Sequence, residues 1–526
     1  MLMHLLQSTA NKINKSIETN PNSFPNLLTI IFFCLGLISI VNHSMWRDEV
    51  NVWLITRDSN SLPDLFKNIK YEGHPGLWYI CLYLLNKITY NPVIMQAFHV
   101  LLATGFVYIF LKYSPFNKTQ KILFIFGYFP FSEYLVISRN YAIGILLLFG
   151  FCALYPTRKK SYLFLSIILF FLANSNAYCL FISIALGVTL VVEYSFGEKI
   201  TKSITASRGN ALCSLIIFFI GIVTSLMLLI PPADSTLQGG LTRWMLRLDI
   251  KHLAKALTRI WNGYILILVP SDRYLDLVIF ALISLFLVAF ASTLLIRKPI
   301  ALFLYLFGTL EIITFTYVKF LGAPRHYGHF YIVLIVCLWI SSYYSNSNLL
   351  TQSLASLPNK FQKAITLWMK FVKKHRTTFI MVILSTQLIG GVFAFSRDLL
   401  IPYSASREAA NFIKSQQLDQ MFIVGSRDAN VSPLCGYLNR KFYYPEKKGI
   451  GSFVLFNKQR SDVDHVAVLE QVSELIKSKK HILLILNSEL TTSNSDLNVS
   501  FLAKFTKSFI SNERYYLYQV NSSTQG

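Results

Sequence analysis

Four residues able to perform acid–base or metal chemistry lie close together after the first apolar run. Asp48 and Glu49 are adjacent in the sequence WRDEVN, and Glu72 and His74 follow in YEGHPG. Carboxylates near a membrane are costly unless they face a cavity or perform a function. Two acidic clusters in one loop can supply a general base or hold a divalent metal ion. We therefore expect Asp48 and Glu49 to be catalytic, and Glu72 and His74 to contact a metal ion or a substrate phosphate.

Cations and aromatic residues occur together at two later points. The sequence FSEYLVISRNY contains Glu133, Arg139 and Tyr141, of which the first two either pair with each other or face a substrate. The sequence GAPRHYGHF, just before a late apolar run, contains cationic residues at an expected helix start. Cationic side chains and free backbone N–H groups at a helix start suit a phosphate, although interface anchoring is an alternative. The residues expected to contact a donor phosphate are Arg139, Tyr141, Arg325, His326 and Tyr327.

Three other groups of polar residues are less specific. Residues 232–273 carry basic residues at helical spacing beside tryptophans, which predicts a basic amphipathic helix at the membrane interface. Glu311 lies inside an apolar run, where it is either functional or paired with a neighbouring helix. Four charged residues near expected strand ends are interpreted as solvated surface, with contact to the acceptor as the alternative: Arg407, Arg427, Asp428 and Arg440.

Membrane helices must position these residues, because the chain is very apolar. Of 526 residues, 53% are hydrophobic and 14% are charged, with 49 Lys and Arg against 26 Asp and Glu. This hydrophobicity excludes a disordered chain, and the thinly spread cations exclude a nucleic-acid partner. About eleven apolar runs have roughly the length that crosses a bilayer. They are 27–42, 93–111, 121–137, 140–156, 162–175, 177–194, 211–231, 274–296, 299–320, 328–344 and 378–396.

The positions of the basic loops predict the orientation. Lys and Arg are concentrated in short connections near 112–121, 158–160 and 297–298 and in the segment 345–377. These segments share one side if the N-terminus, residues 1–26, is cytoplasmic. The opposite side then carries the first outer loop, 43–92, which we expect to lie along the interface as short helices, and the tail after the last span.

The tail, residues 397–526, differs from the membrane region of residues 27–396. It alternates helix-like and strand-like runs, which predicts a small extracytoplasmic α/β domain. Helices are expected at 404–415 and 466–477, and strands at 421–424, 441–444, 453–456, 481–486 and 515–520.

The first outer loop resembles that of GT-C glycosyltransferases. W-x-D-E follows the first span, and E-x-H-P-x-L-x-Y follows in the same loop. Within that class the chain is similar to protein O-mannosyltransferases and lipid A aminoarabinose transferases, which are multi-pass enzymes that use polyprenyl-phosphate-linked sugars. The break NSNAY at 174–178 and the arginine–aromatic segment before a late span also fit, so the resemblance covers roughly residues 25–345. His-Pro-Gly at 74–76 departs from the Pro-Pro pair that many members have.

The resemblance implies an inverting transfer of a sugar from a polyprenyl-phosphate donor to a glycan, lipid or protein acceptor on the extracytoplasmic face. It puts the key aspartate of the family at Asp48, which would act as the base, with Glu49 orienting the acceptor or a metal ion. A divalent metal ion is the one cofactor considered. The expected location is a bacterial inner membrane.

Two other functions remain open from the sequence. A transporter or flippase for polyprenyl lipids or glycans would need charged residues deep in the spans and repeated halves. A non-catalytic scaffold that presents the tail would leave the acidic loop without a role. The acidic residues gather at one surface, which favours the transferase.

Overall fold

The computed structural model describes residues 22–200, 205–237, 244–355 and 358–523. Most of the predicted cytoplasmic segment 1–26 lies outside these residues, as does the basic residue Arg243. Within the described ranges, eight helices are long and apolar enough to cross a membrane. They correspond to eight of the eleven predicted spans: α2 (Ser23–Asn42), α6 (Val93–Tyr113), α8 (Tyr141–Leu154), α10 (Ala177–Ile200), α11 (Arg208–Leu229), α13 (Tyr274–Leu295), α14 (Pro299–Val318) and α17 (Asn359–Leu400).

The other three predicted spans are not among these eight helices. Two are the helices α9 (Leu163–Ala173) and α15 (Pro324–Ser341). The prediction of one span over 121–137 is wrong, because the chain forms α7 (Lys118–Ile125) and then the separate π-helix η1 (Phe129–Glu133). Pro130 has no N–H to donate and so cannot continue a regular helical ladder. This break buries the polar end of η1 beside α15 and α17.

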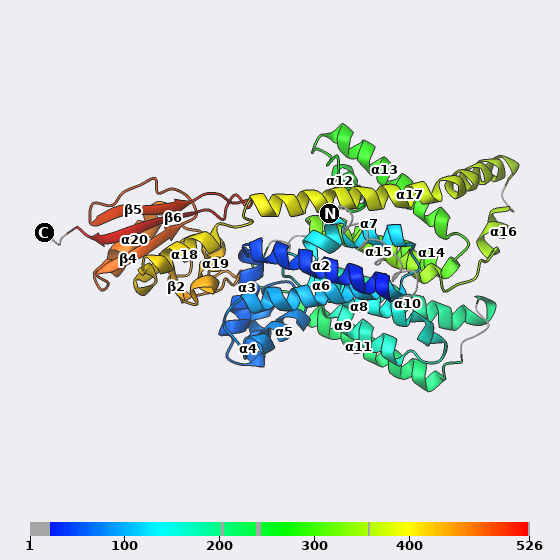
Figure 1. Ribbon diagram of the computed structural model, residues 1–526, viewed down its shortest axis with the longest axis horizontal. Helices are drawn as coiled ribbons and strands as arrows, with labels where there is room; N and C mark the ends of the chain where they lie inside the picture. Colours follow the sequence, from blue (N-terminus) through cyan, green and yellow to red (C-terminus); the bar gives the residue numbers. More distant parts are fainter. Residues whose placement is uncertain (1–21, 201–204, 238–243, 356–357, 524–526) are drawn as a thin grey trace, which may run out of the picture.

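Helix α17 is much longer than the predicted span 378–396. Its 42 residues extend about 63 Å at helical rise, roughly twice the thickness of the hydrocarbon core. The segment 345–377, expected to be a basic loop, therefore contains α16 (Leu349–Ala355) and the first half of α17. These lie at the end of the molecule opposite the sheet (Figure 1). The turn η2 (Tyr155–Lys159) ends α8.

Short helices form the two large outer loops. The first loop contains α3 (Arg47–Asp58), α4 (Leu62–Ile69) and α5 (Leu77–Leu85), and the 232–273 loop contains the predicted basic helix as α12 (Ile250–Tyr264). Residues 50–56 of α3 are buried, because α5 and α19 of the tail cover this helix. The apolar residues of α3 therefore pack against protein.

The tail folds as a six-stranded sheet with helices on both faces, at one end of the molecule (Figure 1). The strand order is β3-β2-β1-β4-β6-β5, with β2, β1 and β4 parallel. The strands are β1 (Phe422–Gly425), β2 (Phe442–Tyr444), β3 (Gly449–Gly451), β4 (His481–Leu486), β5 (Leu497–Phe505) and β6 (Tyr515–Ser522). The helices are α18 (Ser406–Ser415), η3 (Leu418–Gln420), α19 (Asp428–Leu438) and α20 (His465–Ile476). The strand predicted at 453–456 is wrong, and β3, β5 and α19 were not predicted.

The tail and the first outer loop share one hydrophobic core. Val50 and Trp53 of α3 pack in the same cluster as Val431 and Leu434 of α19. Gly436 is required at this contact, because a Cβ atom there would lie 2.5 Å from the Val50 side chain. The sheet domain therefore fixes the helix that carries the acidic residues.

Candidate active site

Three elements far apart in the sequence converge on Asp48. This residue lies in the first turn of α3, Arg139 lies in the turn before α8, and Arg325 lies in the first turn of α15. Arg325 Nη2 is 2.9 Å from Asp48 Oδ2, and Arg139 Nη1 is 3.7 Å from the same oxygen. The Asp48 side chain is 26% exposed, so solvent or a substrate can reach it.

Neighbouring groups hold both guanidinium groups in place. Arg139 Nη1 donates to the backbone carbonyl of Asp48, and Nη2 donates to His74 Nε2 at 2.9 Å. Arg325 stacks on the ring of Trp46, with its Cζ 5.4 Å from the ring centroid. Arg47 also lies near this carboxylate, with Nε 3.7 Å from Oδ1. Because three guanidinium groups face one carboxylate, a positive charge remains that an anion can bind.

Glu49 has a different position from its neighbour. It is fully buried, and its carboxylate interacts with His43 Nε2 at 2.8 Å. It also accepts hydrogen bonds from the N–H groups of Trp46 at 3.2 Å and Ser138 at 2.6 Å. Glu49 thus caps α3 and ties the first outer loop to the turn that carries Arg139. This geometry favours a positioning role.

Replacing Glu49 by glutamine is expected to lower the unfolding temperature of the protein, with activity falling only through misplacement of the site. A glutamine has one oxygen for these donors, and its NH₂ group opposes the other donors, at a cost of about 1–3 kcal/mol for each unmet buried group. Thermal unfolding and transfer activity should be measured together, with exposed Glu470→Gln as the matched control. Loss of activity with an unchanged unfolding temperature would assign Glu49 to the chemistry.

Glu72 and His74 reach the same site, but the described residues around them do not form a metal-binding set. Glu72 accepts hydrogen bonds from Asn51 at 3.1 Å and Tyr79 at 3.4 Å. The Nε2 lone pair of His74 accepts from the cationic Arg139, which would repel a metal ion. No group of three or more His, Cys, Asp or Glu side chains within the described residues is arranged to hold a metal ion. We therefore derive no step through a metal.

The pKa values of Glu72 and His74 are both shifted in the direction that favours the neutral side chain. Burial raises the pKa of Glu72 to about 7, although Arg139 opposes this shift. Burial, with the charges of Arg139 and Arg325, lowers the pKa of His74 to about 3. A neutral His74 is consistent with its role as acceptor for Arg139.

The stability of the protein is expected to depend on the ionisation of Glu72. Because the folded pKa is raised, the stability that protonated Glu72 contributes is complete below pH 4.5 and is lost as the pH rises through about 7. Glu72→Gln, which mimics the protonated form, should match the wild type in unfolding temperature at pH 5 and exceed it at pH 8. Glu470→Gln at the exposed surface serves as the control. If the unfolding temperatures of Glu72→Gln and the wild type differ by the same amount at pH 5 and at pH 8, this prediction is wrong.

The remaining predicted residues surround the arginines. Glu133 accepts from Tyr128 at 2.7 Å instead of pairing with Arg139. Tyr141 is buried, with its ring 6.0 Å from that of His326. His326 and Tyr327 contact other groups of the protein. His326 Nδ1 accepts from Ala323 N–H at 2.9 Å. The Tyr327 ring lies 5.4 Å from the Arg259 guanidinium.

Two charged residues of the tail differ from expectation, whereas the role of Glu311 stays a prediction. Glu311 Oε2 is buried and lacks a hydrogen-bond partner within the described part of the chain. Arg407 donates to the backbone carbonyl of His43 rather than facing solvent. Asp428 is buried in a bidentate pair with Arg460, at 2.7 and 2.9 Å. The interpretation of Arg407 and Asp428 as solvated surface is wrong.

Two residues that hold the site were not predicted. Asn51 connects Glu72 to the tail, because its Oδ1 accepts from Val454 N–H at 2.9 Å. Glu513, in the tail, accepts from the N–H of Arg47 at 3.0 Å, next to Asp48. No local sequence pattern distinguishes Glu513, since its partner is 466 residues away.

Comparisons with known proteins rest on structure alone. No family model and no curated protein sequence matches the chain. A solved structure that it resembles is that of ArnT from Cupriavidus metallidurans bound to undecaprenyl phosphate, with a TM-score of 0.53 and 10% sequence identity. The match covers 95% of this chain and 98% of that chain. It confirms the predicted fold, a multi-pass helical membrane protein with a small C-terminal sheet domain.

Proposed function

We propose that this integral membrane protein is a glycosyltransferase that moves a sugar from a polyprenyl-phosphate donor to an acceptor hydroxyl. One observation carries the proposal: Arg139 and Arg325 converge on the carboxylate of Asp48, within a fold like that of ArnT. The solved ArnT structure contains undecaprenyl phosphate, which supports a donor of this kind here.

In the proposed reaction, Asp48 accepts the proton of the acceptor hydroxyl. Oδ2 faces Arg325 at 2.9 Å and Arg139 at 3.7 Å, whereas Oδ1 faces only Arg47 Nε at 3.7 Å. Oδ1 is therefore the less strongly paired oxygen, and in the proposed reaction it receives the proton. The acceptor oxygen then forms a bond to the anomeric carbon while the bond from that carbon to the phosphate oxygen breaks. Because the acceptor attacks opposite the leaving group, the anomeric configuration inverts.

The two arginines stabilise the leaving phosphate. The polyprenyl phosphate departs with the electron pair of the broken bond, so negative charge grows on its oxygen. Guanidinium groups bind phosphate oxygens through paired N–H donors. Arg325 Nε has no hydrogen-bond acceptor among the described residues, which leaves it a donor for this purpose.

We also propose that the site faces the extracytoplasmic side of a bacterial inner membrane. The support is the basic segment 345–377, which lies at the end of the molecule opposite the sheet domain (Figure 1). Buried apolar contacts join that domain to α3, so the tail and the site share this side.

The test is an assay of the purified full-length chain with undecaprenyl-phosphate sugars and a panel of glycan, lipid and peptide acceptors. The expected result is a new glycosidic bond together with release of undecaprenyl phosphate. Movement of the intact lipid-linked sugar between leaflets of a vesicle, with no glycosidic product, would instead support a transporter and overturn the proposal.

A further inference from the structure

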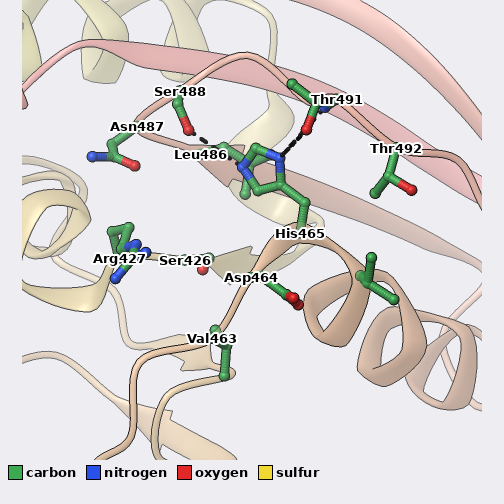
Figure 2. A pocket seen from close by; sticks show the side chains of 11 residues that line it. Ser426, Arg427, Val463, Asp464, His465, Leu486, Asn487, Ser488, Thr491 and Thr492 are labelled. Atoms are coloured by element: carbon green, nitrogen blue, oxygen red, sulfur yellow. Dashed lines mark hydrogen bonds between the residues drawn. The ribbon is translucent and has the colours of Figure 1, made fainter.

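A polar cavity lies in the sheet domain, apart from Asp48. It has a volume of about 370 Å³, within the range of small-molecule sites. Figure 2 shows polar side chains directed toward it from several loops. The residues that matter for the argument are Ser426, Arg427, Asp464, His465, Asn487 and Ser488.

The cavity occupies the position where open α/β sheets bind ligands. Parallel strands β1 and β4 are neighbours, and the lining residues follow their carboxyl ends. Helix α19 packs on one face of the sheet, with Ile423 and Leu483, and α20 packs on the other, with Val424 and Leu484. The helix that follows β1 and the helix that precedes β4 therefore lie on opposite faces of the sheet. This arrangement leaves a crevice at the carboxyl ends of the two strands.

Three backbone N–H groups at the cavity already have acceptors within the protein. The N–H of Ser426 donates to a backbone carbonyl, and that of Arg427 donates to the Glu446 carboxylate. At the start of α20, the N–H of Ala467 donates to Asp464 Oδ1 at 2.9 Å. Phosphate sites depend on free N–H groups of this kind. The carboxylates also repel an anion, so a neutral ligand fits better.

The side chains match the hydroxyl groups of a sugar. Arg427 offers several N–H donors, Asn487 offers a donor and an acceptor, and Asp464 offers acceptors. Val463 and Leu486 supply an apolar surface for the C–H groups of a ring. His465 lies between them, with ring nitrogens 3.3 Å from Ser488 Oγ and 3.2 Å from Thr491 Oγ1.

The cavity is joined to the candidate active site by a short segment. Asn487 Nδ2 donates to the carbonyl of Asn512 at 3.5 Å, and the adjacent Glu513 accepts from Arg47 N–H. We propose that this cavity binds one sugar residue of the acceptor, so that the substrate that receives the transferred sugar is a glycan. This rests on the proposed transferase function.

A substitution at Arg427 tests the site without disturbing the fold. Arg427 has φ +61°, a conformation that favours glycine, so Arg427→Gly removes the guanidinium while relieving strain. Its ion pair with Asp462, at 3.2 Å, is solvent-exposed and contributes little to stability. Lys448 is an exposed cation with φ +50°, and Lys448→Gly is the matched control.

The measurement is saturation-transfer NMR of the full-length protein in a detergent without a sugar head group. The probes are the methyl glycosides of glucose, galactose, mannose and N-acetylglucosamine. At least one should bind to the wild type, Lys448→Gly and Asp48→Asn. Arg427→Gly should weaken that binding about tenfold or more, because a hydrogen bond from a charged group is lost.

The outcomes separate the two proposals. Absence of saturation transfer from all four glycosides, or equal binding by Arg427→Gly, would overturn the sugar site while leaving wild-type transferase activity as evidence for the function. Binding that follows the expected pattern, in a wild-type protein that transfers no sugar from any polyprenyl-phosphate donor, would overturn the function and with it the role of the bound glycan as acceptor.

Discussion

Asp48→Asn is expected to reduce the rate of sugar transfer by about 10²–10⁴-fold, the usual contribution of a general base. Asparagine has nearly the same shape and can still accept a hydrogen bond from Arg325, but it cannot take a proton from the acceptor. The substitution also removes the negative charge that balances Arg139 and Arg325, which favours binding of the anionic donor phosphate. The donor KM should therefore stay the same or fall while kcat drops.

This prediction is checked by steady-state kinetics with a polyprenyl-phosphate sugar, at matched levels of folded protein. Asp496→Asn, at an exposed position of the tail, should behave as the wild type. A value of kcat for Asp48→Asn within threefold of the wild type would remove Asp48 from the role of base. Loss of folded protein in this variant would instead assign Asp48 to the structure, since Arg325 and Arg139 depend on it for pairing.

Arg325→Lys is expected to lower transfer by about 10²-fold, and Arg325→Ala by more, because the leaving phosphate loses its principal partner. Lysine keeps the charge but lacks the planar fork that binds two phosphate oxygens. It also loses the stacking of the guanidinium on Trp46. Both kcat and the affinity for undecaprenyl phosphate, measured as product inhibition, should fall.

Arg397→Lys is the matched control for Arg325→Lys. Arg397 likewise pairs with a carboxylate, that of Asp398 at 2.6 Å, and stacks on an aromatic ring, that of Phe509 at 4.0 Å. It should retain activity, because it does not contact Asp48. Equal losses in both variants would mean that the effect comes from weakened ion pairs at the outer surface rather than from binding of a phosphate.

Much of the fold could be predicted because membrane helices are encoded locally. An apolar run of sufficient length specifies a span by itself, so eight predicted spans correspond to long helices. The run at 121–137 was predicted incorrectly, because hydropathy does not register the break at Pro130. In the tail, the alternating residues Leu497, Val499 and Phe501 of β5 carried a signal that was overlooked, whereas Pro433 and Gly436 concealed α19.

The candidate site was predicted by residue type but not by arrangement. Asp48, Arg139 and Arg325 were all selected, since carboxylates and guanidinium groups at the ends of apolar runs are costly unless they are used. Their convergence depends on contacts across as many as 277 residues. Asp48 and Glu49 are neighbours, yet one faces the arginines and the other is buried against His43 and Ser138.

The sequence by itself determined the membrane character, the approximate spans and the acidic and cationic residues available for chemistry, because length, hydropathy and charge act within one segment. Only the tertiary structure decided which carboxylate meets the arginines, which groups contact Glu72 and His74, and how the tail holds α3. These outcomes depend on the direction of each side chain and on partners supplied by distant segments. The polar cavity between β1 and β4 likewise arises only when the crossovers on the two faces of the sheet diverge.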